Sequence, residues 1–281
     1  MAAPLRPLST GELLDKTFTL YRTNFLLFYG IGALAQGVVF LILLVGTGLI
    51  AGAGRAQSTG FVATTAILGV VMLLVYVVGS LIATAMMQAA TTIAVSDLYL
   101  DKPTGIKLAY ARVKGRVWRM VDVVFSVGLR IGIGFVLLIV PGVLMLMRYS
   151  LAVPAAVLEN LKTREALRRS KELSAGSGGR VLTVYILMAV LIWVVSIGLT
   201  FASAAVLGGN KQDTLLGRQV LQQLISFIAA TIAYPVLTIA LALLYYDQRV
   251  RKEAFDIEHM ISALQPGTGA ASAAAAASSS V

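Results

Sequence analysis

Long apolar segments recur along the chain, and they constrain its fold more than any other feature. Between residues 25 and 246, charged side chains are rare within runs of about 20 residues or more. A helix of about 20 residues is long enough to cross the hydrocarbon core of a bilayer. Only 13% of the 281 residues are charged and 58% are hydrophobic, whereas about a quarter of residues are charged in a typical soluble domain. The sequence therefore predicts a membrane protein.

Six membrane-spanning helices are predicted, at residues 25–50, 61–95, 121–140, 143–158, 181–207 and 220–246. Pro141 and Gly142 are expected to end the third helix and turn the chain. Short amphipathic helices, such as the one that follows Ser9, are expected to lie at the cytosolic surface. The predicted fold class is all-α, with one polytopic membrane domain over residues 1–264. A disordered low-complexity tail is expected at 265–281.

The positive charges are distributed unevenly between the connections. With six spans, 18 of the 23 Lys and Arg residues lie on the side of both termini, and only Arg55, Lys211 and Arg218 lie on the other side. If the fourth segment did not span, the split would be 11 against 10. Because cytoplasmic loops are enriched in Lys and Arg, both termini are predicted to be cytosolic. Basic residues in short clusters between apolar runs suit anionic lipid, and no nucleic-acid partner is inferred.

Two arginines, Arg130 and Arg148, stand inside the apolar segments. A charged side chain at the bilayer centre costs about 3 kcal/mol on insertion scales, and such residues usually have a functional role. The two arginines are predicted to form or flank a site for an anionic group, such as a lipid phosphate. The alternative is that they bond backbone carbonyls freed near Pro141 and Pro154, or extend to the headgroups.

A stripe of polar residues at four-residue spacing runs along the second predicted span. Its members are Ser80, Thr84, Gln88, Thr92 and Ser96. Such a stripe either joins neighbouring helices by hydrogen bonds or lines a polar cavity. In the third span, Gly128 and Gly132 form a GxxxG pair, which predicts a face that another helix approaches closely.

Catalytic residue types are scarce. The chain has no cysteine, and its one histidine, His259, lies beyond the last span. Thiolate chemistry, histidine triads and histidine-ligated metals therefore have no residues to support them. The sequence predicts no metal, no cofactor and no enzyme activity. Two function classes remain: a structural or accessory lipid-associated protein, and a transporter or lipid-handling protein with an anionic-group site at membrane depth. Neither indicates a particular protein partner or oligomer.

Three segments carry a family resemblance: RPLSTGELLDKTFTLYRTNF from Arg6, VPAAVLENLKTREALRRSKEL from Val153 and LLYYDQRVRKEAFDIE from Leu243. They resemble the signature segments of the glycerophosphoryl diester phosphodiesterase membrane-domain family, which consists of bacterial integral membrane proteins of largely unknown function. Some members of that family are fused to a catalytic phosphodiesterase barrel, and this chain contains no such barrel. The resemblance implies a bacterial cytoplasmic membrane and supplies no catalytic residue.

Overall fold

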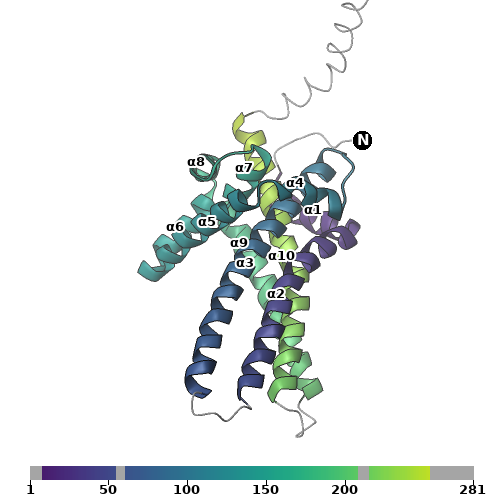
Figure 1. The fold of residues 1–281 in the computed structure, drawn as a ribbon. Helices are drawn as coiled ribbons and strands as arrows, with labels where there is room; N and C mark the ends of the chain where they lie inside the picture. Colours follow the sequence, from purple (N-terminus) through teal and green to yellow (C-terminus); the bar gives the residue numbers. More distant parts are fainter. Residues whose placement is uncertain (1–7, 55–60, 208–214, 254–281) are drawn as a thin grey trace, which may run out of the picture.

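The computed structural model describes residues 8–54, 61–207 and 215–253, which form helices and no strand (Figure 1). The helices are α1 (Thr10–Thr23), α2 (Phe25–Gly54), α3 (Phe61–Tyr99), α4 (Ile106–Lys114), α5 (Val117–Leu137), α6 (Ile139–Tyr149), α7 (Ala152–Leu158), α8 (Thr163–Ser174), α9 (Gly178–Leu207) and α10 (Leu215–Glu253). Six helical segments within these ranges are long and apolar enough to cross a membrane. The all-α polytopic fold is therefore confirmed. The tail at 265–281 and His259 lie outside the described residues.

The long helices α2, α3, α9 and α10 form the body of the molecule (Figure 1). The short helices α1, α4, α7 and α8 gather at one end of this bundle, which we call the polar end. Helices α5 and α6 form a hairpin that leaves the bundle obliquely and stops well short of the far ends of α2 and α3. A surface helix followed by two apolar helices thus occurs three times in chain order, and the middle pair is the shortest.

Helix α1 begins as its sequence predicts. The backbone N–H of Glu12 donates to Ser9 Oγ at 3.2 Å, and the N–H of Ser9 donates to the Glu12 carboxylate at 2.7 Å. This reciprocal capping box satisfies two backbone donors that have no partner inside the helix. Helix α1 buries Leu13, Thr17 and Tyr21 against the bundle.

The hairpin turn differs from its prediction. The chain turns at Leu138, not at Pro141 and Gly142, and α6 already begins at Ile139. Pro141 lies in the first turn of α6, where a backbone N–H would have no partner within the helix, so its missing donor costs little. The predicted span at 143–158 is also interrupted, because α6 ends at Tyr149 and α7 begins at Ala152.

Close packing within the hairpin occurs at a different glycine pair from the predicted one. A Cβ placed on Gly134 would lie 2.8 Å from the Cα of Gly142, and one placed on Gly142 would lie 2.5 Å from the Phe135 ring. The predicted contact face at Gly128 and Gly132 meets nothing within 4 Å. The GxxxG prediction is therefore wrong, and the close approach joins α5 to its own partner α6.

The protein core occupies the half of the bundle nearest the polar end. There α3 packs through small residues, and Ala85, Ala90 and Ala94 are fully buried. In its other half, α3 exposes large apolar side chains such as Ile67 and Leu74. An apolar surface of this kind is expected where lipid surrounds the helices, because hydrocarbon does not penalise its exposure.

Candidate functional site

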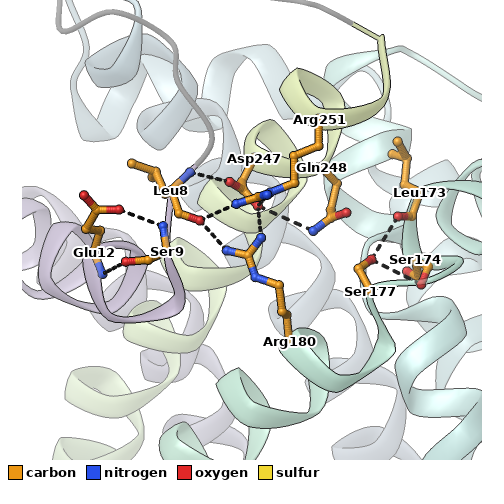
Figure 2. A network of polar contacts seen from close by, with 10 residues as sticks. All are labelled: Leu8, Ser9, Glu12, Leu173, Ser174, Ser177, Arg180, Asp247, Gln248 and Arg251. Atoms are coloured by element: carbon orange, nitrogen blue, oxygen red, sulfur yellow. Dashed lines mark hydrogen bonds and ion pairs between the residues drawn. The ribbon is translucent and has the colours of Figure 1, made fainter.

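A buried carboxylate, Asp247, organises the polar end (Figure 2). Its side chain is completely buried and pairs with two arginines, through Arg180 Nη1 at 2.8 Å and Arg251 Nε at 3.0 Å. The backbone N–H of Leu8 donates to Asp247 Oδ1 at 2.7 Å, and the Leu8 carbonyl accepts from both guanidiniums. One charged centre therefore ties the segment before α1 to α9 and α10.

A second ion-pair cluster joins α7, α8 and α10. Glu159 accepts hydrogen bonds from Arg169 Nε at 3.0 Å and from the Tyr245 hydroxyl at 2.5 Å. Arg169 also pairs with Glu253, and Arg249 Nε lies 3.1 Å from the same carboxylate. Burial lowers the pKa of Arg169, but its hydrogen bonds to Glu159 and Glu253 raise it further, so its pKa lies above the ordinary value. The guanidinium therefore stays charged.

These clusters bring together the three segments on which the sequence-based expectation of a family resemblance rests. Leu8 belongs to the first segment, Glu159 and Arg169 to the second, and Asp247 and Arg249 to the third. Asp97 on α3 makes a further internal pair with Arg112 on α4, with both carboxylate oxygens within 2.8 Å of Nη1. The acidic side chains at the polar end are thus largely used to hold helices together.

Other cations at the polar end are exposed. We call the following set the basic rim: Lys114, Arg116, Arg148, Lys162, Arg164, Arg168 and Lys171. They lie on the turn between α4 and α5, at the end of α6, and on and just before α8. In the part of the chain that the structure describes, the one ion pair of the rim joins Arg168 to the exposed Glu172 at 3.6 Å. Apart from this pair, the positive charges of the rim have no ion-pair partner among the described residues.

Arg148 lies in the last turn of α6, at the polar end of the hairpin, and Arg130 lies near the middle of α5. The backbone carbonyl of Arg148 accepts a hydrogen bond from Ser170 Oγ of α8 at 2.8 Å, and its side chain is exposed. Arg130 is half-buried; its Nη1 donates to the Ser126 carbonyl at 2.8 Å, and its guanidinium lies 5.8 Å from the centre of the Tyr149 ring. Because Ser126 precedes Arg130 on α5, the side chain points back toward the polar end. One of the five guanidinium donors is used, which leaves Arg130 able to bind an anion.

The predicted polar stripe on α3 does not form one continuous path. Ser96 shares a 2.7 Å hydrogen bond with the Tyr246 hydroxyl of α10, as expected of residues that join helices. Ser80 and Thr92 instead donate to carbonyls of α3 itself. Thr84, the remaining small member, is half-buried. Successive members are rotated by about 40°, because four residues exceed one helical turn, and so the stripe faces different neighbours along its length.

A cavity of about 210 Å³ lies where the hairpin meets the bundle. Gln88 and Thr92 of the stripe line it, together with side chains of α5, α6, α7, α9 and α10, among them Tyr149 and Tyr185. Gly128 also lines it, and its missing side chain leaves the space open. The Gln88 amide and the two tyrosine hydroxyls have no hydrogen-bond partner among the described residues. The cavity therefore combines apolar walls with polar groups that are free to bind a ligand.

Arg130 connects the predicted arginine site to this cavity. Its guanidinium contacts the Tyr149 ring, and Tyr149 is part of the cavity wall. Arg148, which directly precedes Tyr149 in the chain, does not line the cavity and belongs to the basic rim. The structure thus brings part of the stripe close to one of the two arginines and separates it from the other.

The described residues contain no group of three or more His, Cys, Asp or Glu side chains that could hold a metal ion. The internal partners of the acidic residues were not predicted, because Asp247 and Arg180 are far apart in the sequence. An Asp directly after the paired Tyr245 and Tyr246, at the end of an apolar run, was the available signal.

Comparison of the chain with family models, curated proteins and solved structures gives no match.

Proposed function

We propose that this chain is a non-enzymatic multi-pass protein of the bacterial cytoplasmic membrane, with an accessory role that depends on binding anionic lipid. The observation that carries the proposal is the division of the cations at the polar end. Arg112, Arg169, Arg180, Arg249 and Arg251 pair with internal carboxylates, whereas the basic rim is exposed. The resemblance to the phosphodiesterase membrane-domain family supports the bacterial location.

The rim lies at the level where headgroups are expected. Its residues stand before α5, at the end of α6 and around α8, next to the point where the apolar hairpin leaves the polar end (Figure 1). Each Lys or Arg near an anionic membrane surface contributes about 1 kcal/mol. Several such residues within a Debye length of the headgroups, about 8 Å at physiological salt, are enough to enrich anionic lipid around the protein.

Neutralisation of the rim tests this function. We expect the triple variant Arg164→Gln, Arg168→Gln, Lys171→Gln to retain fewer phosphatidylglycerol molecules than the wild type in native mass spectra. The matched control is a second triple variant, Arg22→Gln, Lys102→Gln, Lys107→Gln. It removes one exposed cation on α1, one just before α4 and one on α4. Equal lipid retention in the triple variant, the control and the wild type would refute a role for the rim.

The orientation of the chain has its own test. The proposed cytosolic polar end requires Thr163→Cys to be protected from an impermeant thiol reagent in intact cells, and Ser58→Cys to be labelled. Because the native chain has no cysteine, each variant carries a single reactive site. Labelling of Thr163→Cys from outside would exclude this orientation.

A second candidate function is lipid handling at the cavity. The unpartnered Gln88 amide, the two tyrosine hydroxyls and the nearby Arg130 suit the polar part of an anionic amphipathic lipid. Guanidinium binds phosphate through two parallel hydrogen bonds, and an ammonium acts as a point charge. Arg130→Lys and Arg130→Gln are therefore expected to lose bound anionic lipid while the protein stays folded, and Arg148→Gln is expected to reduce only the contribution of the rim. Retained lipid with lowered thermal stability in both Arg130 variants would make Arg130 structural.

A further inference from the structure

The turn of the α5–α6 hairpin consists entirely of apolar residues. From Ile131 to Met147 the sequence contains no polar side chain. At the tip, Val136 is 87% exposed, Leu138 70% and Ile139 73%. The connections between α2 and α3 and between α9 and α10 differ, since they include Arg55, Gln57 and Ser58 in one case and Asn210, Lys211, Gln212 and Asp213 in the other. A turn that emerged from the far side of a membrane would expose its apolar residues to water and headgroups.

Helix α5 as a whole is long enough to cross a membrane, but the part of the hairpin beyond the polar end is shorter than the hydrocarbon core. Asp122 on α5 accepts a hydrogen bond from Thr163 at the start of α8, which places Asp122 at the polar end. From Asp122 to Leu137 the helix rises about 22 Å, and the return helix from Ile139 to Tyr149 rises about 15 Å. Hydrocarbon is about 30 Å thick, and the hairpin lies obliquely, so that its depth is smaller than its length (Figure 1).

The return helix reaches the polar end within this distance. A Cβ on Gly178, where α9 begins, would lie 2.4 Å from Met147 Cε of α6. The neighbouring Arg148 carbonyl is bonded to Ser170 of α8. Helices α3, α9 and α10 rise about 40 to 55 Å from their ion pairs at the polar end to their far ends, at 1.5 Å per residue. The tip therefore ends beside the middle of the bundle, and its side chains are largely exposed in the described part of the chain.

We propose that α5 and α6 form a re-entrant hairpin, which enters the hydrocarbon of the leaflet next to the polar end and returns to the same side. The acyl chains of that leaflet surround the tip, because the exposed tip is apolar and uncharged. The backbone at the turn is consistent with this location, since Leu138 N–H bonds to the Gly134 carbonyl and Gly142 N–H to the Leu138 carbonyl. Pro141 adds no donor, while the N–H groups of Ile139 and Val140 and the last carbonyls of α5 have no partner within their helices, which is an energetic cost of this location.

The charge distribution is the same for a re-entrant and a spanning hairpin. In both arrangements the chain enters and leaves on one side, so the positive residues before α5 and after α7 stay together. Arg130 and Arg148 also become less costly, because both lie within reach of the nearer headgroups instead of at the bilayer centre. The inference does not depend on which side of the membrane the polar end faces.

Single cysteines at the tip test the proposal. Leu138→Cys and Val136→Cys replace exposed side chains, and Ser58→Cys and Lys171→Cys serve as controls for the two sides. With an impermeant maleimide applied to intact cells and to inverted membrane vesicles, each control should react in one preparation, and the tip variants in neither until SDS is added. Reaction of a tip cysteine together with Ser58→Cys would show that the hairpin crosses. Reaction together with Lys171→Cys would show that the tip lies in water; either result would overturn the proposal.

Depth measurement distinguishes lipid contact from burial by another protein. A fluorophore attached at Leu138→Cys is placed in phosphatidylcholine vesicles that carry a nitroxide either at the glycerol end or at the terminal end of the acyl chain. The re-entrant hairpin predicts a larger loss of fluorescence with the chain-end nitroxide. Stronger quenching by the shallow nitroxide would contradict the proposal, as would no quenching by either lipid, which is the result expected if a second copy covered the tip.

Discussion

Replacement of Asp247 by Asn is the sharpest test of how the polar end is held together. Asn has almost the same shape as Asp, so the substitution removes the negative charge and leaves the packing intact. The carboxylate pairs with Arg180 and Arg251 and accepts the Leu8 N–H. Both guanidiniums bond the same oxygen, Oδ2, and Leu8 N–H donates to Oδ1. In Asp247→Asn the two guanidiniums therefore lie side by side with no anion between them, and the amide N–H₂ group faces either both of them or, if the amide is flipped, the Leu8 N–H.

The expected loss of stability follows from the burial of the three partners. Removal of one member of a buried ion pair typically costs about 3 to 5 kcal/mol. The Asp247 side chain is fully buried, but Arg180 is 23% exposed and Arg251 is 38% exposed. Water therefore solvates part of the charge that is left behind, and we expect a loss just below that range, about 2 to 3 kcal/mol.

The assay is unfolding of the purified protein by SDS in mixed micelles, followed by helical circular dichroism. Glu172→Gln is the matched control, because Glu172 pairs with Arg168 at 3.6 Å on an exposed surface. Exposed pairs contribute about 0 to 1 kcal/mol, so this variant should unfold close to the wild type. The double variant Asp247→Asn, Arg180→Gln should recover part of the loss, because it removes one of the two unpaired cations.

A small effect of Asp247→Asn, no larger than that of Glu172→Gln, would refute this account of the network. The same conclusion would follow if the double variant were less stable than the sum of its two single variants predicts. Proteolysis provides a second measurement. Since the carboxylate and both arginines bind the Leu8 backbone, Asp247→Asn should also release the segment before α1 to faster cleavage.

Three further predictions concern other parts of the molecule. Gly134→Ala should destabilise the protein by about 1 to 3 kcal/mol, because its Cβ would lie 2.8 Å from the Gly142 backbone, whereas Gly128→Ala has open space and should have little effect; thermal unfolding of the two variants measures the difference. Ser96→Ala should cost about 1 kcal/mol through loss of its bond to Tyr246, and a double-mutant cycle with Tyr246→Phe measures the coupling between the two side chains. The purified protein should release no glycerol phosphate from a glycerophosphodiester, and release that a point substitution in this chain abolished would contradict the proposed absence of enzyme activity.

The contacts of Arg130 and Arg148 could not be predicted from their neighbours in the sequence. Their apolar neighbours correctly indicate helices that are long and apolar enough to cross a membrane. The neighbours do not show that α6 reaches α8 within a few turns. The sequence therefore suggests a position for Arg148 inside an apolar span, whereas the bond from Ser170 to its carbonyl places it beside α8 at the polar end. For Arg130, the decisive contacts are the Ser126 carbonyl and the Tyr149 ring, and the second depends on how α5 and α6 pack.

The sequence by itself determined that the chain is a membrane protein and that its fold is all-α. Transfer free energy adds along a contiguous segment, so long uncharged runs predict membrane helices without knowledge of their neighbours. The start of α1 was also predictable, because a capping box joins residues three apart. Tertiary structure alone decided the partners of Asp247 and Glu159, the glycines that pack closely, the division of the stripe and the position of the hairpin beside the bundle. Each of these depends on distances and angles between helices remote in the chain, and neither residue spacing nor the count of charges on each side specifies them.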